Sequence, residues 1–262
     1  MADEQSEELV VTTNGNVRVL RINRPEARNA LNSVVIGGLG RGLEEADQDP
    51  DVRAVIVTGT GDRAFCAGMD LRSFANDEQP GGGDPDASRG YARFLREGIS
   101  KPVIGAANAT AVAGGFELLL ACDLVVASEE ARFGIPEVKR GLFAAGGGVG
   151  LGRRLPLAIA LELGLTGDTV DAPRAFALGL VNRVVPSDRV LDEAIELAGR
   201  VAENGPLAVR VTKRLMWEAL DVSRDQMWDL TAAAHGEVFD SEDAKEGARA
   251  FVERRPPQWT GR

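Results

Sequence analysis

The distribution of apolar residues divides the chain into an alternating first part and a helical last part. Up to about residue 186, short apolar or β-branched runs alternate with segments whose apolar residues recur at helical spacing. Beyond Ser187 the spacing is helical only, over 189–202, 207–220, 224–239 and 242–254. This order predicts an α/β core followed by a helical C-terminal region.

The predicted strands are short, and turn residues separate them. Residues 8–13 and 17–22 flank Asn14-Gly15, a hairpin signal, and further strands are predicted at 52–57, 103–107, 124–127 and 180–185. Helices are predicted at 33–47, 89–99, 156–163 and 172–178, with Gly164 and Gly179 as C-caps and Ser187 and Ser241 as N-caps. Pro, Gly and Asp dominate residues 76–88, so we expect a mobile surface loop there.

One stretch, Lys101 to Asp123, combines a buried strand with a helix that opens on Gly114-Gly115. Glu117 lies in the first turn of that otherwise apolar helix. A helix start presents unpaired N–H groups and partial positive charge, and glycine allows another group to approach the backbone. The stretch therefore predicts an oxyanion site with an acid or base beside it. The alternative is an acid that only favours its own helix N-terminus.

Composition limits the classes of function. The 262 residues suit one large domain or a domain with an appendage, and 44% hydrophobic residues are ample for a core. A net charge of −10 argues against nucleic-acid or anionic-membrane partners. The acidic first ten residues do not resemble a signal peptide, and no apolar run has membrane-spanning length. We therefore expect a cytoplasmic location.

Several chemistries have no support in the sequence. The chain contains no G-x-G-x-x-G, no Walker A lysine and no G-x-S-x-G. The single histidine, His235, excludes a multi-histidine metal site, so we predict no metal site. Cys66 and Cys122 have apolar or small neighbours, which predicts buried, reduced thiols.

A spaced set of groups remains. Ala67-Gly68 follows a strand in a tight turn, and Gly114 begins a helix, so both places can direct backbone N–H groups at one oxygen atom. Glu117 and Glu137 are carboxylates in apolar surroundings. This set suits chemistry beside a thioester carbonyl, with donors for an enolate oxygen and carboxylates for a water molecule and a proton. Alternatively, Glu137 is a solvated loop acid that pairs with Lys139 or Arg140.

The motifs resemble the crotonase, or enoyl-CoA hydratase and isomerase, superfamily over nearly the whole chain. NRPEARNALN, AFCAGMDL, GGFELLLACD, FGIPEVKRG and LTGDTVDAPRAFALGLVNRVVP occur in the order and spacing of that family. The resemblance implies a spiral of ββα units with two near-perpendicular sheets over residues 1–200. It also implies a helical trimerisation region over residues 201–262, and a homotrimer or a hexamer that is a dimer of trimers.

The resemblance also assigns roles by position. The oxyanion-hole amides fall on Ala67 and Gly114, and the catalytic acids on Glu117 and Glu137. An acyl-CoA substrate would lie along positions spread over four segments. These are Ala27, Arg28, Gly68, Met69, Asp70, Leu71, Gly115, Pro136 and Ala145. No separate cofactor is implied, because coenzyme A is part of the substrate.

Hydratases of the family keep both acids, whereas isomerases typically lack the first. The resemblance therefore implies an enoyl-CoA hydratase that adds water across the 2,3 double bond of a trans-2-enoyl-CoA. The tail SEDAKEGARAFVERRPPQWTGR is similar to the carnitinyl-CoA dehydratase branch, which is one alternative. An enoyl-CoA isomerase is a second alternative, and a non-catalytic RNA-binding relative is a third that the acidic composition and both retained acids disfavour.

Alanine replaces the family's glycine or proline at several places. The sequence has Asn108-Ala109 where the family has Asn-Gly, Ala113 before Gly114-Gly115, and Ala144-Ala145 where the family has Pro-Gly. Ala145 keeps a backbone donor, because only proline lacks one. We expect these alanines to reshape the acyl pocket and so to influence the choice of substrate.

Overall fold

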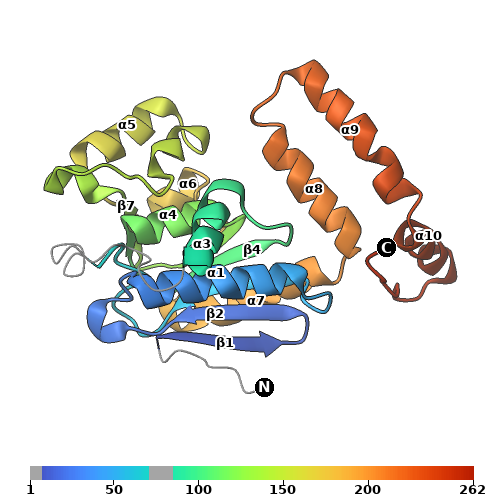
Figure 1. Ribbon diagram of the computed structural model, residues 1–262, viewed down its shortest axis with the longest axis horizontal. Helices are drawn as coiled ribbons and strands as arrows, with labels where there is room; N and C mark the ends of the chain where they lie inside the picture. The colour runs from blue at the N-terminus through green and yellow to red at the C-terminus, as the bar shows by residue number, and fades with distance from the viewer. Residues whose placement is uncertain (1–7, 71–84) are drawn as a thin grey trace.

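The computed structural model describes residues 8–70 and 85–262. Its main sheet has the order β1-β2-β3-β4-β6-β9 (Figure 1). β1 (Leu9–Asn14) pairs antiparallel with β2 (Val17–Ile22), and every later pairing in this sheet is parallel. The other strands are β3 (Ala54–Gly59), β4 (Val103–Ala107), β6 (Leu124–Ser128) and β9 (Arg183–Val185). The predicted hairpin and α/β core are confirmed.

A second sheet contains very short strands. β5 (Ala111–Val112) pairs parallel with β7 (Arg132–Gly134), which pairs antiparallel with β8 (Val170–Asp171). Short 3-10 helices lie at Pro25–Ala27 (η1), Pro136–Arg140 (η2), Gly148–Arg153 (η3) and Ser187–Arg189 (η4). The second sheet places η2 near the helix that begins at Gly114, since β5 directly precedes that helix and β7 precedes η2.

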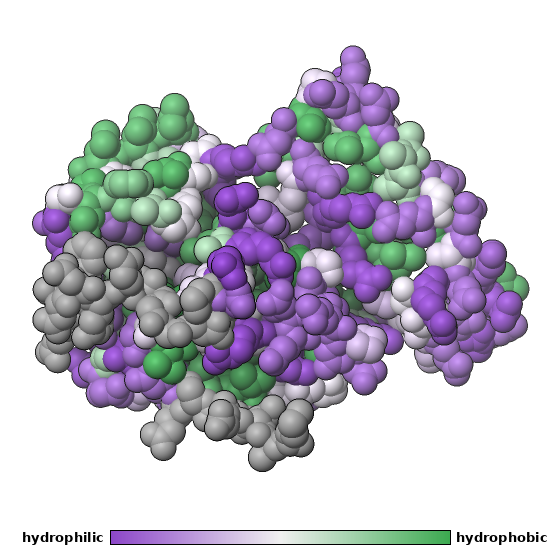
Figure 2. Space-filling view, in the orientation of Figure 1, coloured by the Kyte–Doolittle hydropathy of each residue, from purple (hydrophilic) through white to green (hydrophobic). Residues whose placement is uncertain are grey.

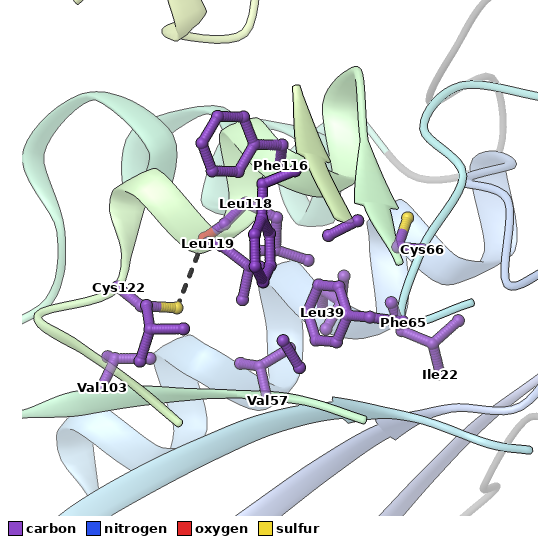
Figure 3. Close-up of a cluster of buried hydrophobic side chains, with 14 of the residues drawn as sticks. Ile22, Leu39, Val57, Phe65, Cys66, Val103, Phe116, Leu118, Leu119 and Cys122 are labelled. Carbon is purple, nitrogen blue, oxygen red and sulfur yellow. Dashed lines mark hydrogen bonds between the residues drawn. The ribbon is translucent and has the colours of Figure 1, made fainter. Parts of the chain in front are cut away.

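Apolar side chains alternate between the two faces of the main sheet and form two cores. Val55 and Val57 of β3 face one core, and Ile56 faces the other. The first core is packed by helices α1 (Ser33–Gln48), α3 (Pro85–Glu97) and α4 (Gly114–Ala121). Figure 3 shows α4 side chains Leu118 and Leu119 meeting Leu39, Val57 and Phe65 there. The second core is covered by α7 (Val190–Ala202).

Two of the remaining helices, α5 (Leu157–Thr166) and α6 (Ala172–Ala177), add buried residues to the first core, and the others lie outside it. α5 and α6 follow η3, whereas α8 (Pro206–Glu218), α9 (Arg224–Phe239) and α10 (Glu242–Glu253) form the C-terminal region. Figure 1 shows α8 and α9 as an arm that extends away from the sheet. None of the described helices is long and apolar enough to cross a membrane.

Asp123 attaches the arm to the core. Its carboxylate accepts hydrogen bonds from Val103 N–H (2.7 Å), Lys213 Nζ (2.7 Å) and Trp217 Nε1 (2.9 Å). The Lys213 and Asp123 side chains are both mostly buried, at 13% and 14% exposed, so this ion pair is little screened by water. The second half of α8 is thereby fixed against β4 and the end of α4.

Some element ends differ from the sequence predictions. Ser241 caps α10, as predicted, but Ser187 does not cap α7. Its hydroxyl instead lies 2.6 Å from that of Ser128, and a 3-10 turn precedes the helix. Gly164 lies inside α5, which ends at the left-handed Gly167, whereas Gly179 follows α6 with a positive φ as predicted.

Two predicted segments also need correction. The strand predicted at 180–185 is formed only by Arg183–Val185. Residues 85–88 of the predicted surface loop belong to helix α3, and the rest of that loop, 76–84, lies outside the described residues. Asp86 and Ser88, at the start of the helix, explain how a polar segment can begin one, since such residues suit first turns.

Candidate active site

The turn at residues 66–68 lies directly against the first turn of α4. A Cβ atom on Gly115 would stand 2.2 Å from the carbonyl oxygen of Cys66, and one on Gly68 would stand 2.9 Å from the amide nitrogen of Gly114. Gly68 also has φ +89°, a conformation that favours glycine. Glycine is therefore required at both places for the turn and the helix to meet.

The predicted oxyanion amides differ in their hydrogen bonding. The Gly114 N–H has no acceptor within the described part of the chain, and it lies at the positive end of α4. The Ala67 N–H donates to the carbonyl oxygen of Arg28 at 3.1 Å. A ligand oxygen that used both donors would have to share the Ala67 N–H with Arg28 or replace that carbonyl.

Ala113 immediately precedes Gly114 and has an unusual backbone conformation. Its φ and ψ are +52° and −134°, in a region that glycine adopts much more readily. Its N–H donates to Gly134 O (3.0 Å), and its carbonyl accepts from the amides of Phe116 (2.8 Å) and Glu117 (3.0 Å). A residue in such a conformation costs on the order of 1–3 kcal/mol, and here it aims the first amides of α4 outward.

Glu117 is buried in α4, and a glycine-rich segment surrounds its carboxyl group. Oε1 accepts a hydrogen bond from Gly148 N–H at 2.8 Å. A Cβ atom on Gly146 would stand 2.6 Å from Oε2, so a side chain at that position would displace the carboxyl group of Glu117. Burial raises the pKa of Glu117 above 4.5, and the N–H groups of Gly148 and Gly146 lower it only in part.

Glu137 lies in η2 and is half-buried. Its Oε2 atom is buried and has no hydrogen-bond partner among the described residues. Burial raises its pKa, the charge of Glu117 raises it further, and Arg140 lowers it. Lys139 pairs instead with Asp168 at 2.7 Å. The Glu137–Lys139 ion pair that the sequence left open is therefore absent. The carboxyl groups of Glu117 and Glu137 are close enough for the charge of Glu117 to raise the pKa of Glu137.

A cavity of about 340 Å³ lies beside Glu117. Its walls come from the end of α3, the segment around η3 and the end of α8. Lining residues include Phe94, Leu95, Glu117, Gly146, Arg154 and Trp217. The alanines at 109, 113, 144 and 145 do not line this cavity. Their expected effect on an acyl pocket therefore stays a prediction.

The segments predicted to hold coenzyme A lie next to one another. Besides the Ala67–Arg28 bond, Leu31 N–H donates to Gly68 O (2.8 Å) and Asp70 N–H donates to Leu31 O (3.0 Å). The Asp70 carboxylate pairs with Arg24 at 3.2 Å, which gives it a structural partner. Ala27 ends η1, and Met69 bridges to Leu31.

The other predicted positions are more dispersed. Gly115 is packed under Cys66, Pro136 begins η2, and Ala145 is exposed between η2 and η3. Leu71 lies outside the described residues. The structure thus brings together the segments around residues 28, 67 and 114 and the two acids.

Sequence reasoning missed several residues that build this site. Asn29 is fully buried, donates to Thr60 O (3.0 Å) and Ala64 O (2.7 Å), and holds the segment that carries Arg28. Gly146 and Gly148 belong to a run of three glycines, and they surround the carboxyl group of Glu117. Their separation of about 30 residues from Glu117 left no local signal that could have linked them.

Metal and thiol chemistry gain no support from the described residues. They contain no group of three or more possible metal ligands. Both cysteines are free and buried, as predicted, and burial raises the pKa of Cys66 to about 12. The His235 ring stacks on Phe239 in α9 at 4.2 Å between ring centroids.

Comparison with known proteins identifies the family. The sequence profile described as enoyl-CoA hydratase/isomerase matches residues 12–262, and the chain belongs to this family. Enoyl-CoA hydratase EchA19 of Mycobacterium tuberculosis is 39% identical over 99% of this chain and 98% of its own length. Carnitinyl-CoA dehydratase of Proteus mirabilis is 39% identical, with coverage of 98% and 100%.

Solved structures agree with this assignment. The crystal structure of an enoyl-CoA hydratase from M. tuberculosis H37Rv superimposes with a TM-score of 0.91 and 45% identity, and the match covers 98% of this chain and 100% of that one. The fold is therefore the crotonase fold, as the sequence resemblance implied.

The electrostatic influence of Glu117 on Glu137 can be measured directly. In the wild-type protein we expect both carboxyl groups to titrate above 4.5. Glu117→Gln removes a negative charge, so the pKa of Glu137 should fall, whereas Glu129→Gln in an exposed turn should leave it unchanged. NMR titration of ¹³C-labelled glutamate carboxyl groups reports both values. An unchanged Glu137 midpoint in Glu117→Gln would contradict the coupling.

Proposed function

We propose that this chain is a hydratase of trans-2-enoyl-CoA thioesters. The observation that carries the proposal is the pairing of Glu117 and Glu137, two partly or fully buried acids with raised pKa values, beside the free amide of Gly114. Family membership and the names of the relatives support an acyl-CoA thioester as substrate.

In the proposed reaction, the thioester oxygen accepts hydrogen bonds from the amides of Gly114 and Ala67. These donors stabilise the negative charge that develops on that oxygen as an enolate forms. Glu117 and Glu137 hold one water molecule, whose oxygen forms a bond to C3 while one carboxylate accepts its proton. A proton from the same pair is then delivered to C2 of the enolate, which gives the 3-hydroxyacyl-CoA. No further cofactor takes part in this proposal.

The raised pKa values suit this exchange. Burial makes the charged form of each acid costly, so a proton is shared readily with a water molecule or a substrate carbon. The Gly148 N–H on Glu117 offsets part of that cost and orients its carboxyl group. The pair can therefore serve as both base and acid in one turnover without any other titratable group.

A carnitinyl-CoA dehydratase remains the second candidate, because several relatives carry that name. A trimethylammonium group would need an aromatic or acidic cage. The cavity beside Glu117 is lined by two aromatic side chains, Phe94 and Trp217, and by acids such as Asp221. The Arg154 guanidinium lies 5.6 Å from the Trp217 ring centroid, so a cation already occupies that ring. This contact disfavours a second cation at Trp217 and supports the general hydratase as the first proposal.

Hydration of crotonyl-CoA, followed by loss of the conjugated thioester absorbance, tests the proposal. We expect turnover by the wild type and a fall in kcat of about 10²-fold or more in Glu117→Gln and in Glu137→Gln, with little change in KM. Glu162→Gln, on an exposed face of α5, is the control and should remain active. Absence of hydration of any short or medium enoyl-CoA would overturn the proposal.

We also propose that the protein is a homotrimer or a dimer of trimers, with residues 201–262 supporting the contacts between copies. Figure 2 shows apolar surface over α5 and over the α8–α9 arm. On α5, Leu157, Leu161 and Leu165 are 65%, 47% and 73% exposed and recur every four residues. On the arm, Met216, Leu220, Trp228 and Phe239 are exposed. Apolar surface on this scale is typical of an interface.

Analytical ultracentrifugation tests this assembly. We expect a mass of three or six chains for the wild type, and smaller species for Leu165→Glu, because a charge would then be buried in the interface. Glu162→Gln on the same helix should keep the wild-type mass. A monomeric wild type at micromolar concentration would contradict the proposed assembly, whatever its activity.

A further inference from the structure

The cavity beside Glu117 also contains an arginine at the far end of α4. Arg154 follows η3 and lines this cavity together with Glu117 and Leu120. Its Nη1 atom donates a hydrogen bond to the carbonyl oxygen of Leu120 at 3.1 Å. One cavity therefore holds an acid from the first turn of α4 and a cation that is attached to the last turn of the same helix.

The order of groups along α4 matches the order of groups along an enoyl thioester. Gly114, Glu117 and Leu120 follow one another at intervals of three residues, and each interval is a rise of about 4.5 Å along the helix. In the proposed reaction the Gly114 amide meets the thioester oxygen, and Glu117 acts on the water molecule that is added at C3. Arg154, bound to Leu120, is therefore placed beyond C3, where the distal end of the acyl chain would lie.

Arg154 is a partly buried cation whose hydrogen bonding is incomplete. A guanidinium group carries five N–H donors, and the bond to Leu120 uses Nη1 only. Its Nε and Nη2 atoms have no acceptor among the described residues, and neither is closed off from solvent. Burial lowers the pKa of the group, which nevertheless stays charged at neutral pH. Since a charge that loses water needs a counter-ion and hydrogen bonds, the free edge of Arg154 is suited to an anion.

The other charged groups that line this cavity are mostly engaged with partners. Asp123, which raises the pKa of Arg154, already accepts hydrogen bonds from Lys213 and Trp217. Glu218 is exposed, and water screens its charge. Two further ion pairs lie within the lining, Arg153 with Asp221 (2.7 Å) and Arg96 with Glu97 (3.2 Å). Within the described chain, Arg154 is the cation of this lining that lacks a carboxylate at ion-pair distance.

The alternative is a purely structural role for Arg154. A cation near the last turn of a helix is favoured by the helix dipole, and the guanidinium also lies 5.6 Å from the ring centroid of Trp217. Both contacts hold the group in place, but neither requires the Nε and Nη2 donors. Those two donors lie in one plane and can together meet both oxygen atoms of a carboxylate.

We propose that Arg154 is a specificity-determining residue that binds a carboxylate at the distal end of the acyl chain. The inference rests on the proposed function and refines it, because it names the substrate class. The preferred substrates are short trans-2-enoyl-CoA thioesters that end in a carboxylate, not plain fatty-acyl ones. A short chain is expected, since only about 4.5 Å of helix rise separates Glu117 from Leu120.

Matched pairs of substrates isolate the carboxylate. 4-Carboxy-trans-2-butenoyl-CoA and 5-methyl-trans-2-hexenoyl-CoA differ only in a carboxylate against an isopropyl group of similar shape, and 5-carboxy-trans-2-pentenoyl-CoA and 6-methyl-trans-2-heptenoyl-CoA form the next pair. For at least one pair we expect the wild type to prefer the carboxylate by tenfold or more in kcat/KM, because a site built to bind a polar group rejects the analogue that lacks it. No preference in either pair, or a preference for 4-trimethylammonio-trans-2-butenoyl-CoA over the carboxylates, would overturn the inference.

Substitutions at Arg154 are read as the ratio of kcat/KM for the carboxylate to that for its isopropyl analogue. Arg154→Met should abolish the preference, mainly through a higher KM for the carboxylate, because the bond is made in the ground state as well. Arg154→Lys keeps a positive charge without the planar pair of donors, so it should retain part of the preference. Arg96→Met is the control, since it removes a cation from the same lining whose side chain is 84% exposed, and it should keep the full preference.

The ratio separates recognition from a structural role. If Arg154 only supported α4, its loss would lower kcat/KM for both members of a pair alike, and an unchanged ratio in Arg154→Met would overturn the inference. If Arg154→Met does not fold, the wild-type preference and its weakening in Arg154→Lys decide instead. A full preference in Arg154→Lys would then contradict the role of the planar donors.

Calorimetric binding of the saturated compounds, 4-carboxybutanoyl-CoA and 5-methylhexanoyl-CoA, gives a readout that does not need turnover. We expect the wild type to bind the carboxylate more tightly by tenfold or more, and Arg154→Met to lose this difference. Absence of hydration of every enoyl-CoA, with the binding preference retained, would overturn the proposed reaction alone. Hydration of crotonyl-CoA without any preference for a carboxylate would overturn the role of Arg154 alone.

Discussion

The site depends on one close contact, that between the 66–68 turn and the first turn of α4. Gly115 lies so near the Cys66 carbonyl that a single added carbon would stand 2.2 Å away. This contact sets the Gly114 amide beside the backbone of Gly68, one residue after Ala67, and it fixes the direction in which α4 leaves the sheet. Glu117 follows within the same turn, so the backbone donors and the first acid are positioned together.

Glu117 then imposes a second requirement on residues far along the chain. A buried carboxylate needs donors, and the N–H of Gly148 supplies one at 2.8 Å. A Cβ atom on Gly148 would stand 2.5 Å from the Cβ atom of Ala144, and one on Gly146 would stand 2.6 Å from Oε2 of Glu117, so a side chain at either position would disturb the surroundings of the carboxyl group. Burial raises the pKa of Glu117 by more than these donors lower it, so the pKa stays raised. The charge of Glu117 in turn raises the pKa of Glu137. Burial of the Glu117 carboxyl group therefore both costs folding stability and raises the pKa that suits proton transfer.

Local sequence patterns predicted the main sheet and most of the helices, because those elements bury continuous apolar faces. The family resemblance implied a second sheet, but local patterns did not predict its strands, because β5 and β8 have only two residues each and carry no period. Ser187 was assigned to a cap because its type favours caps, but contact with Ser128 across the sheet edge decided its place. Propensity describes a residue's own turn, and it cannot anticipate a partner 59 residues away.

The candidate site, like the fold, was predictable from the sequence only where its features are local. Gly114, Glu117 and the Ala67-Gly68 turn could be named, because glycine spacing and an acid in an apolar helix are local features. The bond from Ala67 to Arg28 and the glycines around Glu117 depend on packing between distant segments. The expected effect of Ala113 on the acyl pocket stays a prediction, and its glycine-like backbone conformation could not be read from the sequence.

A crystal structure with 3-hydroxybutyryl-CoA bound would test the central claim most directly. The account predicts that the thioester oxygen accepts hydrogen bonds from both the Gly114 and Ala67 amides, that the Ala67 N–H no longer bonds only to Arg28, and that the 3-hydroxyl lies within hydrogen-bond distance of Glu117 and Glu137. A thioester oxygen bound elsewhere, with the 3.1 Å Ala67–Arg28 bond unchanged, would contradict it.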